Sequence, residues 1–472
     1  MSAFKFKFST SDAAEPTNRH ILRLAVPALG TLAAEPLMGL VDTALVGHLG
    51  SIELAALGAA NTLLGFLFTI LIFLEYGTTA RLSWRVGARE TDRLAHEAVQ
   101  MGWLASILGL FLTGLMLFFP RQLLQVLEVP SEVLSAGALY LSIRALGGVA
   151  GLWIRVGNGI FRGLQDTKTP LMIVVGMNLL NALLAAVLIF GWPQLGIPAL
   201  GIAGAAWATV VATWVGGIAF LWILQRRLVG VEQPDLPTPL NRKQAGFRFG
   251  KPFGLPLYLW PRWKILRDML AMSRDLLLRT MALQAALFTG TRMAASFGTA
   301  SLAAHQVGWQ LWIFLALLLD SLAIAGQALV GKTLGAGRVK HARSVGNRLC
   351  LWGFGLGVVF CVGFLMLRGV LPRIFSEDPA VLAAVDSIFG FLAWMQIPNS
   401  VLFVLDGLLI GASDMAFIRN SMISLGILGV LVTWLAGTLE GSLRGIWIGI
   451  TLFMLARMGV MGLRWMGRGW IR

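Results

Sequence analysis

The segment 33-AAEPLMGLVDTALVGHLG-50 is apolar enough to lie inside a lipid bilayer, yet it contains two carboxylates, Glu35 and Asp42. The two acids are seven residues apart, so a helix places them on one face, about two turns from each other. An ionisable group near the bilayer centre costs about 2.5–3.5 kcal/mol on insertion scales, and such residues usually face a partner or a cavity. The segment therefore predicts a membrane-spanning helix with a functional acidic face.

The composition of the whole chain predicts the same environment. Of the 472 residues, 57% are hydrophobic and only 13% are charged, and the mean hydropathy is +0.76. A soluble protein carries about 25% charged residues. Runs of about 20 apolar residues recur along the chain, the length that spans a bilayer as a helix. Their continuous apolar character excludes the alternating strands of a membrane β-barrel, so we predict an all-α polytopic membrane protein.

The apolar runs define twelve expected spans. They cover residues 21–47, 53–80, 95–119, 133–160, 169–191, 200–225, 266–291, 300–330, 345–368, 380–409, 418–438 and 444–466.

The formal net charge of +15 reflects topology in this interpretation. Most of the 38 Lys and Arg residues fall on the side that holds both termini and the even-numbered loops. The positive-inside rule then places both termini in the cytoplasm, with the chain in the plasma (inner) membrane. Because the basic residues lie at helix ends, we expect contact with anionic lipid rather than with nucleic acid.

Motifs for catalysis are lacking in the sequence. The five histidines are scattered, and neither a phosphate-binding loop nor a nucleophile motif occurs. We therefore do not expect an enzyme, a metal site or a cofactor. A membrane enzyme is a weak alternative, because the loops are short and hold no His/Asp/Glu clusters, and a channel is a weak alternative as well.

The two halves of the sequence repeat each other at a constant offset, which takes Gly50 to Gly298. The shift lays 49-LGSIELAAL-57 on 297-FGTASLAAH-305 and 157-GNGIFRGLQD-166 on 405-LDGLLIGASD-414. Six helices per copy give both copies the same orientation, so the repeats are parallel. We expect a cytoplasmic tail (1–20), an N-lobe (21–225), a cytoplasmic linker with six prolines (226–265) and a C-lobe (266–472).

Further charged residues lie within the expected spans. Asp275 and Arg279, at i and i+4, have the spacing of an intrahelical ion pair. Asp320 has no charged neighbour in the sequence, and Asp406 takes the place of Asn158, so these two and Asp275 are the candidates of the second lobe. Glu75 is expected to form a snorkelling pair at a helix end with Arg81.

Helix ends and kinks are also predicted from single residues. Asp166 and Asp414 occupy equivalent turns and are expected to cap the helices that follow. Pro36 frees the carbonyl of Leu32 and favours a kink beside Glu35.

Four segments together resemble the multidrug and toxic compound extrusion (MATE) family, and within it the DinF-like branch. They are 35-EPLMGLVDTALVGHLG-50, 273-SRDLLLRTMALQ-284, 319-LDSLAIAGQALVGKTLGAG-337 and 403-FVLDGLLIGASDMAFIRNSM-422. The resemblance extends over nearly the whole chain. It implies a twelve-helix transporter with two lobes that exports organic, often cationic, compounds in exchange for H⁺ or Na⁺.

The resemblance also assigns roles to residues. It implies that Asp42 is the proton site and that protonation bends the first helix near Pro27 and, in this chain, Pro36. The family partners on helices 5 and 6 correspond to Asn181, Ala185 and Thr209. Ala185 replaces the usual helix 5 carboxylate, and Glu35 is the candidate for the missing second acid.

The coupling ion and the substrate remain open at this point. A sodium site built from Asp42, Thr43, Asn178, Asn181 and Thr209 is an alternative to proton coupling. An exporter of organic anions or lipid-like compounds is the alternative to a cation exporter, since Arg144 and Arg155 lie within spans. We expect a monomer whose partners are a small organic substrate and the bilayer.

Overall fold

The computed structural model describes residues 18–127, 129–229 and 260–471. Within these residues the chain consists of α-helices, short 3-10 turns and connecting loops, with one isolated β-bridge between Trp192 and Ile197. The cytoplasmic tail, apart from residues 18–20, and most of the linker predicted at 226–265 lie outside the described residues. The all-α prediction is confirmed.

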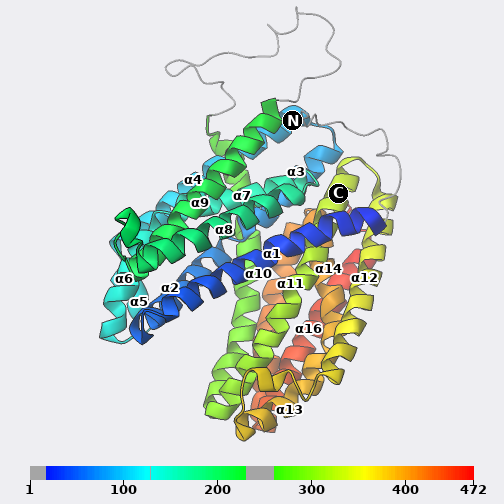
Figure 1. The fold of residues 1–472 in the computed structure, drawn as a ribbon. Helices are drawn as coiled ribbons and strands as arrows, with labels where there is room; N and C mark the ends of the chain where they lie inside the picture. The colour runs from blue at the N-terminus through cyan, green and yellow to red at the C-terminus, as the bar shows by residue number, and fades with distance from the viewer. Residues whose placement is uncertain (1–17, 128, 230–259, 472) are drawn as a thin grey trace, which may run out of the picture. The chain divides into compact units, whose positions relative to one another are not determined.

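Sixteen labelled helices build the described part of the chain (Figure 1). The first half holds α1 (Asn18–Gly47), α2 (Ser51–Ile70), α3 (Phe73–Gly87), α4 (Thr91–Phe118), α5 (Pro120–Gln125), α6 (Ser131–Ala145), α7 (Gly148–Gly163), α8 (Lys168–Phe190) and α9 (Ile202–Val229). The second half holds α10 (Trp263–Ser296), α11 (Thr299–Gly335), α12 (Val339–Met366), α13 (Pro379–Trp394), α14 (Gln396–Gly411), α15 (Met415–Glu440) and α16 (Leu443–Met466).

These helices account for the twelve expected spans. In the described residues, nine spans are long and apolar enough to cross a membrane, with α2 and α3 counted as one. Two further spans are bent helix pairs, α6 with α7 at 56° and α13 with α14 at 51°. The twelfth is α10, which carries more charged residues and corresponds to α1 in the repeat. The prediction of twelve helices in two six-helix repeats is therefore confirmed, and the chain is a multi-pass membrane protein.

The repeat offset reappears in the helix limits. The same shift that takes Gly50 to Gly298 takes the starts of α2, α4, α6 and α7 to the starts of α11, α12, α13 and α14. Both bent spans also break at the equivalent place, before Gly148 and before Gln396. Sequence and backbone geometry therefore describe the same duplication.

Equivalent glycines make a close helix crossing in each repeat. A Cβ at Gly159 would lie 2.6 Å from the carbonyl oxygen of Glu75, and one at Gly407 would lie 2.7 Å from Cα of Ala323. Glu75 and Ala323 are themselves equivalent positions of the repeat. Because the facing atoms belong to a backbone, only a residue without a side chain permits this approach, as is usual where membrane helices pack closely.

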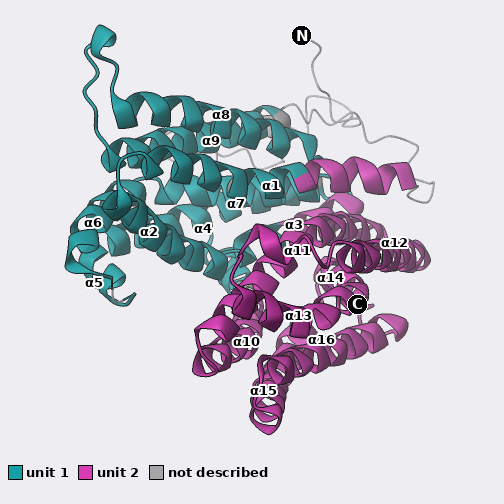
Figure 2. Cartoon of the chain, turned by 60° about the horizontal axis from the view of Figure 1, so that its bottom comes forward, with its two compact units in different colours: residues 1–15, 30–78, 89–270 teal, residues 16–29, 79–88, 271–472 magenta. Residues whose placement is uncertain are grey.

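The chain forms two compact units (Figure 2). Unit 1 comprises residues 1–15, 30–78 and 89–270, and unit 2 comprises residues 16–29, 79–88 and 271–472. Residues 21–29 and 79–88, which were predicted to belong to the N-lobe, thus pack with unit 2. The helices α1, α3 and α10 each contribute to both units.

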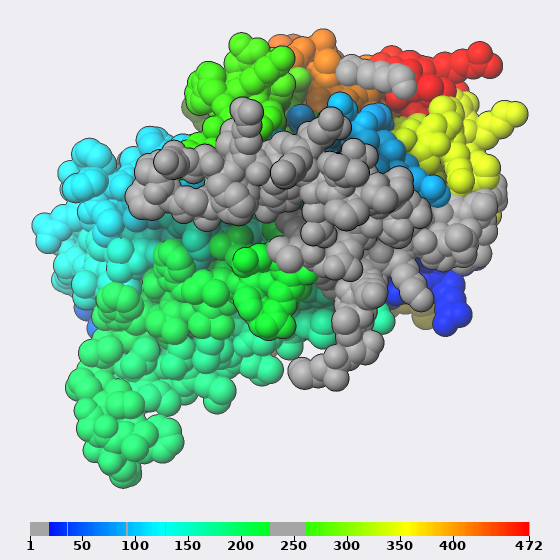
Figure 3. All heavy atoms as spheres, turned by 90° about the horizontal axis from the view of Figure 1, so that it is seen from above, coloured from blue at the N-terminus to red at the C-terminus, as the bar shows by residue number. Residues whose placement is uncertain are grey.

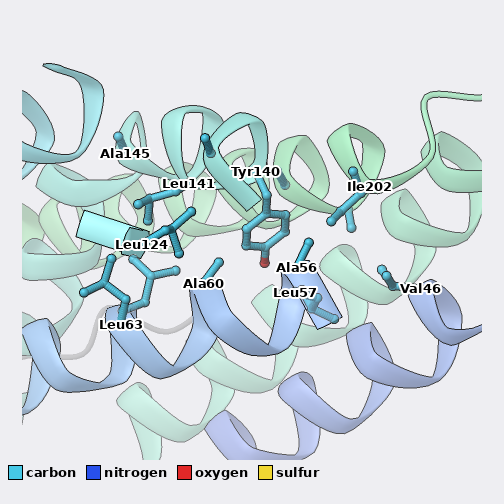
Figure 4. Packing of buried hydrophobic residues seen from close by; sticks show 14 of the residues in the cluster. Val46, Ala56, Leu57, Ala60, Leu63, Leu124, Tyr140, Leu141, Ala145 and Ile202 are labelled. Atoms are coloured by element: carbon cyan, nitrogen blue, oxygen red, sulfur yellow. The ribbon is translucent and has the colours of Figure 1, made fainter. Parts of the chain in front are cut away.

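Unit 1 contains a core centred on Tyr140 of α6. Its ring lies above Ala56 and Leu57 of α2, with Ile202 of α9 on one side (Figure 4). The outer face is apolar as well: α8 exposes Met172, Val175, Leu179 and Leu183 at helical spacing. Residues of the second half of unit 1 form the green part of the face seen in Figure 3. An apolar stripe suits contact with lipid, because the hydrocarbon offers no partner to polar groups.

Equivalent turns precede α8 and α15 but use their aspartates differently. Asp166 Oδ1 accepts hydrogen bonds from the backbone N–H groups of Lys168 and Thr169, at 3.1 Å each, which confirms the predicted cap. Asp414 gives α15 no side-chain cap and instead pairs with Arg464 at 2.7 Å. The predicted cap at Asp414 was wrong, because its carboxylate pairs with the guanidinium of Arg464 on α16 and makes no hydrogen bond to the first turn of α15.

We predict that Gly407→Val lowers the stability of the protein by about 1–3 kcal/mol, because a side chain at this crossing would force α14 away from α11. Gly355→Val is the matched control, since a Cβ at Gly355 meets no atom within 4 Å. Thermal unfolding in detergent should show a lower midpoint for Gly407→Val only. Equal midpoints for the two variants would show that the crossing is not a tight contact.

Candidate functional site

Asp42 of α1 is buried in unit 1, with 4% of its surface exposed. The Asn181 side chain of α8 donates a hydrogen bond from Nδ2 to Asp42 Oδ1 at 3.0 Å. The Thr209 hydroxyl of α9 lies 3.5 Å from Asp42 Oδ2. Three of the residues predicted for the coupling site therefore meet at one carboxylate, although they come from three helices.

The Thr209 hydroxyl has two competing acceptors. It donates to the carbonyl oxygen of Ala205 at 3.0 Å, a shorter contact than the one to Asp42. A hydroxyl has a single proton to donate. Thr209 can therefore turn toward the carboxylate when Asp42 is ionised and toward its own helix when Asp42 is neutral.

Two residues of α6 belong to this site but were not predicted for it. The guanidinium of Arg144 interacts electrostatically with Asp42. The hydroxyl of Tyr140, one turn before Arg144, interacts with Arg144, Thr209 and Asp42. The sequence did contain a sign of these two residues. Tyr140 and Arg144 lie at i and i+4 in a mainly apolar helix, and the chain has only three tyrosines.

The other residues predicted for the coupling site lie on the same helices. Asn178 does not reach Asp42: its Nδ2 donates to the carbonyl oxygen of Ala34 at 2.6 Å. Ala185 is fully buried one turn beyond Asn181, so this face of α8 offers no second carboxylate. Glu35 lies within α1, and its side chain is outside the described part of the structure.

The two candidate hinge prolines lie inside a continuous helix. α1 runs from Asn18 to Gly47 through Pro27, which is buried, and Pro36, which is exposed. Unit 2 takes α1 up to Leu29, and unit 1 takes it from Gly30. The helix thus passes from one unit to the other just after Pro27, where its backbone ladder lacks a donor.

Asp406 of α14 forms a buried ion-pair cluster in unit 2. Its Oδ2 accepts from Nη2 of Arg279 on α10 at 2.7 Å and from Nη2 of Arg457 on α16 at 2.9 Å. The Arg457 side chain is only 3% exposed. The predicted pair of Asp275 with Arg279 is therefore wrong, because Arg279 extends across the bundle to Asp406.

Asp275 and Asp320 are the other two candidates of the second lobe. Asp275 pairs with Arg419 of α15 at 2.7 Å and with its neighbour Arg274 at 3.1 Å. Asp320 lies half-buried on α11. Asp275 therefore ties α10 to α15, while Asp406 ties α10, α14 and α16 together.

Glu75 of α3 is buried as well, contrary to the predicted snorkelling position at a helix end. It forms ion pairs with two arginines of α7, Arg155 and Arg162. The carboxylate is 6% exposed, and the Arg162 side chain 2%. A helix-end pair was predicted because the sequence shows Arg81 nearby and gives no sign that α7 packs against α3.

The buried acids differ in the groups that surround them. Within the described residues, no three His, Cys, Asp or Glu side chains are grouped as metal ligands. Asp42 is contacted by donors that can rotate or withdraw, whereas Asp406 and Glu75 are held by guanidinium groups. Asp42 is therefore a buried acid with neutral hydrogen-bond partners.

A family profile and individual relatives both match most of the chain. The profile of the MatE family matches residues 27–187 and 277–435, two stretches that end at equivalent positions of the repeat. The chain is 31% identical to Protein DETOXIFICATION 44, chloroplastic, of Arabidopsis thaliana, over 93% of this chain and 80% of the relative. It is 27% identical to the DNA damage-inducible protein F of Escherichia coli (strain K12), over 93% and 90% of the two chains.

Solved structures share the fold. The chain superposes on a crystal structure of MATE in the bent conformation with a TM-score of 0.82 and 20% identity, covering 96% of this chain and 95% of the other.

We predict that Asp406→Ala destabilises the protein by about 3–5 kcal/mol, because it leaves the buried Arg457 guanidinium without its carboxylate. Asp386→Ala is the control: its pair with Arg368 is equally short, at 2.7 Å, but lies at the surface, where ion pairs contribute little. Thermal unfolding of both variants in detergent should show a large loss for the first and none for the second. A small loss for Asp406→Ala would mean that water solvates Arg457.

Proposed function

Because the chain belongs to the MatE family of membrane transporters, we propose that it exports organic compounds by proton antiport, with Asp42 as the residue that binds the proton. The family consists of secondary transporters that export compounds and are not enzymes. The coupling residue, the coupling ion and the class of compound are our proposal.

The observation that carries this proposal is the surroundings of Asp42. The carboxylate is almost fully buried, and its partners Asn181 and Thr209 are neutral. A buried carboxylate changes its protonation state more readily beside neutral hydrogen-bond partners than in an ion pair, because protonation then breaks no direct salt bridge. The Arg144 guanidinium also interacts with Asp42 electrostatically and compensates its charge when the acid is ionised.

Competition for one charge accounts for antiport. An ionised Asp42 attracts a cationic compound, and a protonated Asp42 does not. Binding of the proton therefore weakens binding of the compound, and by linkage the compound weakens binding of the proton to the same degree. Drug-like, often cationic, compounds are the substrates that this coupling serves best.

Movement of α1 is the second part of the proposal. Solved family members have been described in a bent and in a straight conformation, and this chain superposes on them with TM-scores of 0.82 and 0.80. In this chain the prolines Pro27 and Pro36 are the positions where α1 can bend. We propose that protonation of Asp42, with Glu35 as an auxiliary acid, favours the bend.

The remaining parts of the proposal concern the membrane, the coupling ion and the oligomeric state. We place the chain in the plasma (inner) membrane with both termini in the cytoplasm, as the distribution of Lys and Arg indicates. H⁺ is the coupling ion, no cofactor or nucleic acid takes part, and the transporter acts as a monomer.

Export of organic anions is the second candidate. Arg144 and Arg155 lie half-buried within the spans of unit 1. A guanidinium in a membrane span is expensive to retain and suits a carboxylate or sulfonate on a substrate.

We predict that Asp42→Asn abolishes proton-driven export, with at least a tenfold loss of rate, because asparagine keeps the size of the side chain but cannot take up a proton. The measurement is dye efflux in proteoliposomes under an imposed pH gradient. Asp386→Asn, at the exposed pair with Arg368, is the control and should keep the full rate. Full activity of Asp42→Asn would disprove the proposed role.

Glu35→Gln tests the auxiliary acid in the same assay. A partial loss of rate is expected, because Asp42 remains as the primary site. An unchanged rate would remove Glu35 from the proposal and leave Asp42 as the single acid.

The coupling ion and the substrate class can be separated in one experiment. Proteoliposomes with an imposed proton gradient or an imposed sodium gradient are loaded with a cationic or an anionic dye. We predict export of the cationic dye under the proton gradient only. Export driven by sodium, or export of the anionic dye alone, would replace this proposal with one of the alternatives.

A further inference from the structure

The contact between α3 and α7 in unit 1 is built from buried charges. Arg162 Nη1 forms an ion pair with Glu75 Oε1, and Arg155 Nη1 lies 3.6 Å from Glu75 Oε2. The side chain of Arg155 is 16% exposed, whereas those of Glu75 and Arg162 are 6% and 2% exposed. The groups that surround Asp42 are Asn181, Arg144 and Thr209, so the presence of three further charges inside this part of the membrane span needs another explanation.

The three equivalent positions in unit 2 carry uncharged side chains. The repeat offset moves Glu75, Arg155 and Arg162 onto Ala323, Phe403 and Ile410. Ala323 and Ile410 are buried in the helix crossing of α11 and α14, and the nearby Asp406 of α14 pairs with arginines of α10 and α16. An ion cluster at these three positions is therefore not a requirement of the duplicated scaffold.

The two crossings also differ in the continuity of one helix: α3, which carries Glu75, follows a break after α2, whereas the equivalent helix α11 is unbroken. At the junction of α2 and α3 the backbone N–H groups of Leu71, Ile72, Leu74 and Glu75 donate to carbonyls three residues back, at 3.1–3.2 Å. Such a 3-10 stretch inside a helix often marks a hinge. In unit 2, α11 runs unbroken from Thr299 to Gly335.

The far end of α3 packs with unit 2. Residues 79–88 belong to that unit, where a Cβ at Gly335 would lie 3.0 Å from Cα of Trp84. A Cβ at Gly87 would lie 2.9 Å from the backbone nitrogen of Ala336. One end of α3 is thus held by backbone contacts in unit 2, and the other end by ion pairs in unit 1.

We propose that Glu75, Arg155 and Arg162 are positioning residues of the transport cycle: they form an ion latch that holds α3 against α7 and opens as α3 swings at residues 71–75. The equivalent helices α11 and α14 stay packed throughout. The inference rests on the proposed export by proton antiport, for which the transporter must alternate between two states, and it names α3 as a helix that moves between them.

The physical reason is the cost of opening each contact. An apolar contact that opens exposes hydrophobic surface to water, which is unfavourable in proportion to its area. Ionised groups recover their hydration when the contact opens, and this offsets the loss of their pairing. A contact that must open and close repeatedly is therefore better built from ions, and a permanent contact from apolar side chains.

The test gives unit 1 the apolar side chains of the equivalent crossing, as the triple variant Glu75→Ala, Arg155→Phe and Arg162→Ile. Replacing a buried ion cluster with apolar groups is often neutral or stabilising, so we expect a variant at least as heat-stable as the wild type. Affinity for a cationic dye should stay within twofold of the wild type, while the rate of proton-driven export falls at least tenfold. Export at the wild-type rate would overturn the latch.

If the triple variant folds poorly, a charge reversal tests independently whether export needs the ion pair between residues 75 and 162. Glu75→Arg alone places like charges together and should stop export. Adding Arg162→Glu restores the pair in reverse, and we expect at least a fivefold recovery of the rate. No recovery would overturn the latch.

These results are distinguishable from those for Asp42. A normal rate in the triple variant, with Asp42→Asn inactive, would remove the latch and leave the proposed function intact. A normal rate in Asp42→Asn would remove proton coupling at Asp42, whatever the latch variants show.

Discussion

A charged side chain inside a bilayer must be solvated by the protein, because the hydrocarbon offers no partner. Four buried or half-buried acids, Asp42, Glu75, Asp275 and Asp406, satisfy this constraint with side chains from other helices. Each interaction therefore ties together helices that are distant in the sequence. These interactions help to fix the positions of the helices that supply the partners, which are α7, α8, α10, α14, α15 and α16.

The duplication shows where function has modified a common scaffold. Thr209, beside Asp42 in unit 1, is equivalent to Arg457 in unit 2, and Asn158 is equivalent to Asp406. Asp42 and Asn181 correspond to the glycines Gly290 and Gly429. Asp42 in unit 1 thus has neutral hydrogen-bond partners, whereas Asp406 in unit 2 is paired with two arginines. The same backbone therefore supports two different surroundings for a buried acid.

The spans and the repeat were predictable because they depend on local composition. Apolar length determines where a helix crosses the membrane, and the constant repeat offset recurs in helix starts and bends. The pairing of charges was not predictable in the same way. Asp275 and Arg279 have the spacing of an intrahelical pair, yet each reaches a different helix. A long arginine side chain pairs with whichever acid the packing of the helices brings near. The spacing of residues in the sequence does not show which acid that is.

The sequence by itself determined the environment, the twelve spans, the internal repeat and the acidic face of α1, because each is a matter of composition or period along one chain. The tertiary structure decided which polar groups surround each acid: Tyr140 and Arg144 near Asp42, two arginines of α7 at Glu75, and Arg457 at Asp406. These neighbours come from helices that meet only when the bundle packs. The protonation and the mobility of a buried acid depend on such neighbours, so they are properties of the fold.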